Sequence, residues 1–363
     1  MKRKSADSNP EKLNAPGTLD GKGRETNYAL RMMTASILLV LLFIVSFLLG
    51  RYPITPAELF GMLGDNILSL FGSGTDQFWT DQTEAVFFSV RLPRILLACM
   101  VGCCISAAGA AYQGTFQNPM AAPDILGASS GAAFGAALAI LLRFPYWGIM
   151  ASAFAFSIIT VALVMMVSKF SGTSRVLGLI LGGIIISSLF TAGTSFIKLV
   201  ADPNDQLPQI TYWLMGSLAE SKMSQVGFVC IPMLLGIVPL VLLRWRINIL
   251  TLGDAEASSM GVDSKRVRAI VIFCATLITA ASVSVSGMIG WVGLVVPHLA
   301  RRLIGNNYMR LLPMTMVIGA LFLLGVDDIS RNLMATEIPL GILTSLVGAP
   351  FFLYLLTRKG EVL

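Results

Sequence analysis

Long apolar stretches recur along the whole chain, and nine of them run for sixteen residues or more without Lys, Arg, Asp or Glu. The hydrocarbon core of a bilayer is about 30 Å thick, and about 20 apolar helical residues span it. Inside that core every backbone N–H and C=O must bond within its own segment, which favours helices. We therefore predict apolar helices in the intervals 31–51, 94–124, 124–143, 143–169, 175–198, 222–244, 268–301, 310–327 and 337–358.

The interval 268–301 is too long for one span and long enough for two short ones. Its middle, residues 282–287, reads Ser-Val-Ser-Val-Ser-Gly, and such small residues suit a turn. Counting it twice gives an all-α polytopic membrane protein with ten transmembrane helices, so both termini lie on one side.

The distribution of basic residues predicts which side that is. Basic residues are enriched in cytoplasmic segments. With both termini in the cytoplasm, most of the 26 Lys and Arg residues lie inside. The outer segments keep only Arg51, Arg91, Arg94, Arg143, Lys198, Lys222 and Arg331.

Three parts of the chain follow from this pattern. Residues 1–28 are polar and rich in Lys, Gly, Asn and Pro, which indicates a disordered cytoplasmic tail. Residues 29–358 form the ten-helix domain, with a cytoplasmic segment at 244–268. Residues 359–363 are a cytoplasmic C-terminus.

Composition narrows the function classes. Only 13% of residues are charged, and no Gly-rich phosphate-binding loop, nucleophile–base pair or basic–aromatic surface for nucleic acid occurs. Cys99 and Cys103 lie four residues apart, but no second His/Cys pair completes a metal site, so helix packing is the preferred interpretation. His298 follows Pro297 near a predicted helix end and is interpreted as structural.

The predicted spans contain small and hydroxyl residues and lack ionisable groups at their centres. Gly127, Gly131 and Gly135 recur every four residues, a pattern typical of close helix contact. The segment 182–195 carries a stripe of Ser and Thr that either lines a water-filled path or bonds between helices. Because ion-coupled carriers usually keep charges within the membrane, any energy for transport is expected from outside the bilayer.

The inner segment 244–268 contains helix-capping signals. Asp254 is a candidate N-cap of a short helix, Gly261 suits its C′ position, and Asp263 or Ser264 suits the cap of the next helix. We predict two short helices that meet at a sharp corner on the cytoplasmic face, with an ordinary connecting loop as the alternative.

Several short motifs occur in order along the chain. They are Arg91-Leu92-Pro93-Arg94, Gln117-Asn118-Pro119-Met120, Trp213-Leu214-Met215-Gly216, Leu252-Gly253 with Ala257 and Gly261-Val262, Gly293-Leu294-Val295-Val296-Pro297-His298, Asp328-Ile329-Ser330-Arg331, and Glu337-Ile338-Pro339-Leu340-Gly341. Over residues 30–358 the chain thereby resembles the FecCD-type permeases, the membrane subunits of type II ABC importers for iron–siderophores, haem and vitamin B12.

The resemblance implies a dimer of twenty helices and four sets of functional residues. Arg91, Arg94 and Arg331 would dock an extracytoplasmic substrate-binding protein. Asn118, Met120, Thr173 and Ser174 would form a cytoplasmic gate. The segment 176–199 would line the translocation path, with Gly182, Gly183, Ser187 and Thr191. The coupling segment would contact the ATPase through Leu252, Gly253, Asp254, Ala257, Gly261 and Val262.

The expected partners are two cytoplasmic ATPase subunits, the binding protein, a second copy or homologue of the chain, and the bilayer of the bacterial cytoplasmic membrane. No enzymatic activity, cofactor, metal or nucleic acid is expected in this chain. An iron chelate, above all a ferric siderophore, is the expected cargo, with haem or cobalamin as alternatives. Competing functions from other classes are a secondary carrier or channel and a non-transporting scaffold.

Overall fold

The computed structural model describes residues 20–69, 77–170 and 175–357, and all regular structure in these residues is helical. The longer helices are α1 (Asp20–Leu48), α4 (Leu92–Phe116), α5 (Ala128–Leu141), α6 (Tyr146–Phe170), α7 (Arg175–Val200), α9 (Met223–Leu242), α12 (Ser264–Ser286), α13 (Val292–Ile304), α14 (Tyr308–Asn332) and α15 (Leu340–Thr357). The shorter elements are α2 (Pro56–Ser69), α3 (Asp81–Ala85), η1 (Val86–Arg91), η2 (Pro123–Leu126), α8 (Gln206–Met215), α10 (Arg244–Leu250) and α11 (Asp254–Ser259).

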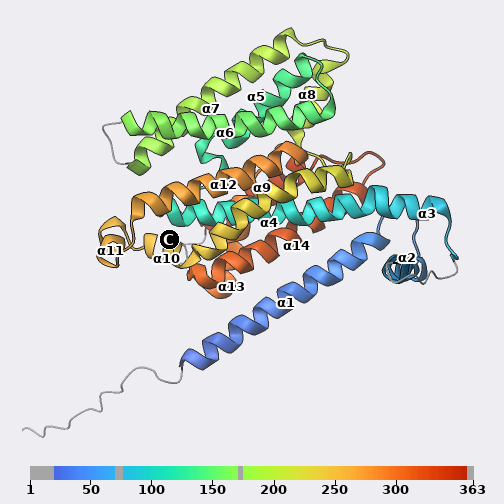
Figure 1. The fold of residues 1–363 in the computed structure, drawn as a ribbon, viewed down its shortest axis with the longest axis horizontal. Coiled ribbons are helices and arrows are strands. Elements are labelled where there is room, and N and C mark those ends of the chain that lie inside the picture. The colour runs from blue at the N-terminus through green and yellow to red at the C-terminus, as the bar shows by residue number, and fades with distance from the viewer. Residues whose placement is uncertain (1–19, 70–76, 171–174, 358–363) are drawn as a thin grey trace, which may run out of the picture.

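Helix α4 is the centre of the bundle, where it packs against α12, α13 and α14. Helices α5, α6 and α7 pack on one another and form a second group beside α12, as Figure 1 shows. Helix α1 lies on the other side of the bundle, along α14. The α10–α11 corner and the α2–α3 region lie at opposite ends of the bundle (Figure 1).

The outer surface of the bundle is apolar. On α9, Ile231, Leu235 and Leu242 are more than 60% exposed, and on α7 the same holds for Leu189 and Phe196. Such faces suit lipid or another apolar helix, not water. Seven helices in the described residues are long and apolar enough to cross a membrane, and α5 and α15 add shorter apolar helices. The chain is a multi-pass membrane protein, whereas ten spans and cytoplasmic termini stay predictions.

The interval 268–301 contains two helices, as predicted, but the break lies later than expected. Helix α12 continues through the serine-rich segment to Ser286, and the chain turns between Gly287 and Trp291, both of which have positive φ. The hydroxyls of Ser282 and Ser286 donate to carbonyls four residues earlier, at 2.7 and 2.9 Å. Because these bonds satisfy the serines inside the helix, the helix ends only at glycine.

The predicted tail over residues 1–28 is corrected at its end, because α1 begins at Asp20. The apolar run that follows provides a long helix, which extends backwards through Lys22, Arg24 and Glu25 in spite of the poor helix propensity of Gly21 and Gly23. Residues 1–19 and 358–363 lie outside the described part of the chain.

Glycines allow backbone contact between the central helices. A Cβ on Gly109 of α4 would lie 1.8 Å from the Gly293 carbonyl oxygen of α13, and one on Gly102 would lie 2.3 Å from that of Gly319 in α14. Gly131 and Gly135 contact α6 in the same way, as their spacing predicted. Gly127 is instead the residue before α5, with φ 75°, and lies against Ser187 of α7.

Candidate functional site

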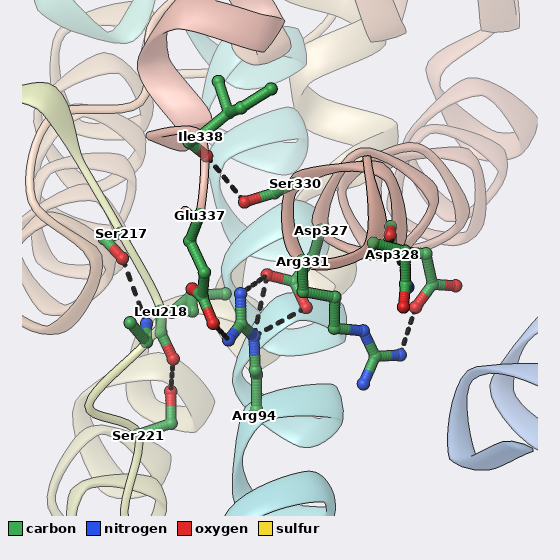
Figure 2. Close-up of polar contacts among 12 residues, drawn as sticks. Arg94, Ser217, Leu218, Ser221, Asp327, Asp328, Ser330, Arg331, Glu337 and Ile338 are labelled. Atoms are coloured by element: carbon green, nitrogen blue, oxygen red, sulfur yellow. Dashed lines mark hydrogen bonds and ion pairs between the residues drawn. The ribbon is translucent and has the colours of Figure 1, made fainter. Parts of the chain in front are cut away.

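The arginines predicted to dock a binding protein lie in a cluster of ion pairs. Arg94 is held by two carboxylates, as Figure 2 shows. Its Nε and one terminal nitrogen donate to both oxygens of Asp327 at 3.0–3.1 Å. Its other terminal nitrogen donates to Glu337 at 2.8 Å. The Asp327 side chain is fully buried. Such a buried bidentate pair fixes the guanidinium in one orientation.

Arg331 and Arg91 are also buried and bonded within the chain. Arg331 donates to the Asp328 carboxylate and, at 2.7 Å, to the Ser46 carbonyl oxygen, which joins α14 to α1. Arg91 donates to the carbonyl oxygens of Phe47 and Tyr52. Exposed fractions of 4% for Arg91, 5% for Arg94 and 7% for Arg331 mean that none is open to a partner in this arrangement. Their docking role stays a prediction, and it requires a rearrangement that uncovers them.

The hydroxyl stripe of α7 faces a surface hollow of about 630 Å³. Gly183, Ser187 and Thr191 line it, together with Ser188 and Ser195 of the same helix. Gly182 does not line it and lies near Val164 of α6. The hydroxyls of Ser188 and Ser195 also donate within their own helix, at 2.8 and 2.9 Å. These two hydroxyls therefore form part of a polar wall without needing a partner helix to satisfy them.

Asp124 is the charged residue that lines this hollow, and sequence reasoning missed it. It lies in η2, the 3-10 helix between α4 and α5, and accepts a hydrogen bond from Ser129. The segment is fixed against α7, because a Cβ on Gly183 would lie 2.1 Å from the Ile125 carbonyl oxygen. The predicted lining of hydroxyls and glycine is thus accompanied by one carboxylate.

The predicted gate turn follows α4. Gln117 adopts a left-handed conformation that ends the helix, and the Asn118 side chain accepts from the Met120 N–H at 2.8 Å. The Met120 side chain is exposed. Thr173 and Ser174, the other predicted gate residues, lie outside the described residues.

The inner segment forms the short helix predicted between Asp254 and Gly261, which is α11, but the next helix, α12, is a long one and not the second short helix that was predicted. The short helix that meets α11 at a corner is instead α10, which precedes it and was not predicted. Val262 donates to the Ala257 carbonyl at 2.9 Å across Gly261, which has φ 75°, so Gly261 ends α11 as expected. Ala257 and Val262 are buried and hold the corner together, whereas Leu252 projects with 59% exposure. Asp263 caps α12 by accepting from the Arg266 N–H at 3.1 Å.

Asp254 does not cap α11, which corrects the prediction, because Gly253 occupies the N-cap position. The Asp254 carboxylate instead binds Arg268 of α12, at 2.9 and 3.3 Å. Arg268 is 3% exposed and also donates to the Thr115 carbonyl in the last turn of α4. Gln117 donates to the Leu250 carbonyl at 2.7 Å. Two contacts thus join the coupling segment to the helix that carries the gate turn.

The remaining candidate chemistry is sparse. No three His, Cys, Asp or Glu side chains within the described ranges gather in a way that could hold a metal ion. His298 lies in the middle of α13, not at its end, with its ring 6.2 Å from that of Phe351. The residues missed by sequence reasoning are Asp124, Asp327 and Arg268. A signal for Asp327 was available in the sequence. Arg94 and Asp327 have opposite charges, and each ends an apolar stretch on the side that was predicted to be outer.

Comparisons with known proteins agree with the resemblance. The sequence model described as the FecCD transport family matches residues 38–358. A molybdate import system permease protein of Haemophilus influenzae is 40% identical over 90% of this chain and 95% of its own length. A probable iron chelatin transport system permease protein of Helicobacter pylori is 40% identical over 76% of this chain and 84% of its own.

A solved structure of a metal-chelate type ABC transporter in an inward-facing conformation superposes with a TM-score of 0.80. It is 39% identical in sequence, and the match covers 90% of this chain and 99% of that chain.

Proposed function

The chain belongs to the FecCD transport family and is a permease subunit of an ABC importer, and from that premise we propose that its cargo is an iron chelate, above all a ferric siderophore. Family membership removes the secondary carrier and the scaffold from consideration. The same family includes permeases for haem and for cobalamin, so these two molecules stay alternative cargoes.

The observation that carries the cargo proposal is the hollow on α7. Its wall consists of Ser and Thr hydroxyls, small residues and the carboxylate of Asp124, and no Lys or Arg lies among its described lining residues. Hydroxyls form weak contacts with many polar groups, which suits a bulky chelate that must leave as readily as it enters. Two copies facing each other would double this surface.

Molybdate is the second candidate, because the molybdate permease of Haemophilus influenzae matches 90% of this chain. An oxyanion is best held by basic side chains or helix N-termini. Among the described residues that line the hollow, the charged group is the carboxylate of Asp124, which repels an anion. The charge of this wall therefore favours a neutral or cationic chelate over a bare oxyanion.

The test is ATP-dependent uptake into proteoliposomes that contain the permease, its ATPase subunits and its binding protein. We expect a radiolabelled ferric siderophore to accumulate and molybdate at equal concentration not to. Accumulation of molybdate alone would contradict the cargo assignment while leaving the importer function intact. Omitting the ATPase subunits should abolish uptake in every case.

The proposal places this chain in the bacterial cytoplasmic membrane, with ten spans and cytoplasmic termini. It works as a pair, with a second copy or a homologue. Two ATPase subunits bind the α10–α11 corner, where exposed Leu252 and Met260 offer apolar contacts. The binding protein docks at the opposite end, the end of the bundle where α2 and α3 lie (Figure 1). Arg94 lies in the first turn of α4, which follows α3 and η1, and Arg331 lies in the last turn of α14.

Arg268 carries motion from the corner to the gate in this mechanism. It bonds Asp254 on one side and the Thr115 carbonyl, just before the gate turn, on the other. Replacing Arg268 with Met keeps the apolar stem and removes both contacts. We expect transport per ATP hydrolysed to fall about tenfold, the usual size of a coupling of 1–3 kcal/mol. Uptake and phosphate release measured in the same proteoliposomes give this ratio.

The matched control is Arg266→Met. Arg266 lies two residues away, is 85% exposed at its side chain and pairs with exposed Asp263. Exposed pairs of this kind contribute at most about 1 kcal/mol, so the ratio should stay near that of the unchanged protein. Equal effects of the two substitutions would argue against a coupling role for Arg268.

A further inference from the structure

The Arg94 cluster explains how a buried arginine can serve as a docking site. Resting on the proposed docking function, we propose that Glu337 occupies the place on Arg94 that a carboxylate of the binding protein takes on docking. Docking then proceeds by exchange of one carboxylate for another. Glu337 thereby keeps Arg94 neutralised while no binding protein is present.

The two carboxylates hold Arg94 in different ways (Figure 2). Asp327 binds two nitrogens of the guanidinium with both oxygens and has a fully buried side chain. Glu337 binds only the third nitrogen, at 2.8 Å, and its side chain is 33% exposed. A buried charge is costly to leave unpaired, whereas a partly exposed one can be hydrated. Asp327 is therefore the fixed partner and Glu337 the exchangeable one.

Space for the exchange lies beside Glu337. A cavity of about 570 Å³ is lined by Glu337 and its neighbours Ala335 and Thr336, by Trp213 of α8, and by Arg51. Arg51 is exposed and donates to the Met334 carbonyl of the same connecting segment at 3.1 Å. A displaced Glu337 side chain would thus enter a partly polar cavity with another cation on its wall.

Release of Glu337 would act on the segment 333–339, which joins α14 to α15. Ser330 and Ile338 exchange two hydrogen bonds, at 2.6 and 3.3 Å, just after Glu337. The Leu340 N–H then donates to the Gly216 carbonyl at 2.9 Å, where α8 ends. This segment therefore joins the end of α14 covalently to the start of α15, and the ion pair of Glu337 ties it to Arg94.

The first test measures the affinity of the cognate binding protein for the permease–ATPase complex in nanodiscs. Glu337→Gln removes the competing charge, and we expect the Kd to fall about 2- to 5-fold, the upper part of the range for loss of one partly exposed ion pair. Glu220→Gln is the control, because Glu220 is an exposed carboxylate that lines the same cavity. It should leave the Kd unchanged.

An unchanged or higher Kd for Glu337→Gln overturns the exchange. An equal decrease in Glu220→Gln also overturns it, because the effect would then reflect surface charge alone. If the unchanged protein binds no binding protein at all, the proposed docking function fails and the exchange fails with it.

The second test measures the accessibility of the segment 333–339 and does not depend on the affinity of the binding protein. Thr336, which is exposed, is replaced with Cys in a background free of the natural cysteines, and its rate of labelling by a membrane-impermeant maleimide is measured. We expect Glu337→Gln to raise the rate severalfold without any partner. An unchanged rate would mean that Glu337 does not restrain the segment.

Discussion

Replacing Asp327 with alanine is expected to lower the free energy of unfolding of the permease by about 3–5 kcal/mol. Asp327 binds two nitrogens of Arg94, and both side chains are almost entirely buried. Removing the carboxylate leaves a guanidinium charge inside the helix bundle, and Glu337 reaches only one of its nitrogens. The measurement is an unfolding titration of the purified permease in mixed micelles.

Two further variants separate the ion pair from general loss of charge. Glu220→Ala removes an exposed carboxylate and should change the free energy by no more than about 0.5 kcal/mol. Replacing both partners with apolar residues, Arg94→Met with Asp327→Leu, should recover most of the lost stability, because no unpaired charge remains. A double variant as unstable as Asp327→Ala would mean that the buried charge is not the cause.

Replacing Gly109 with alanine is expected to destabilise the fold by about 3 kcal/mol, although alanine is the better helix former. The added methyl group would lie 1.8 Å from the Gly293 carbonyl oxygen, and that oxygen belongs to the backbone of α13. No side chain can move aside to relieve this clash, so α4 and α13 must separate. The same unfolding titration detects the loss.

Gly227→Ala is the matched control. Gly227 also lies inside an apolar helix, α9, but a Cβ there would meet no atom within 4 Å. In that open position alanine should be neutral or stabilising by up to about 1 kcal/mol. Opposite signs for the two substitutions would show that helix separation, not propensity, determines the effect. Similar values would contradict the close contact of α4 and α13.

Sequence patterns predicted the features of this protein that depend on neighbouring residues. Charge-free stretches predicted the long helices, since burial in lipid leaves the backbone no alternative. Gly261 at the end of α11 and Asp263 at the start of α12 were identified because a cap acts on residues within one turn. The extra turn of α12 was missed because serine hydroxyls can bond within a helix as well as break it.

Contacts between distant residues were beyond the reach of these patterns. Arg94 and Asp327 lie 233 residues apart, and nothing local to either residue indicates its partner. Asp254 was assigned to a cap because acidic residues favour that position, but its carboxylate found the nearly buried Arg268 of α12 instead. Asp124 was overlooked for the same reason, since only the fold brings it beside the hydroxyls of α7.

The position of α4 has a mechanical consequence. This helix carries Arg94 near one end and the Thr115 carbonyl near the other, and its 25 residues extend about 37 Å. Between those ends, the backbone of α4 contacts that of α14 at Gly102 and that of α13 at Gly109, so these helices cannot come closer together. Bending α4 alone would require these contacts to open, so its two ends move together with its neighbours as one solid block. A binding event at the Arg94 end and one at the Thr115 end that act on this block compete for a single displacement.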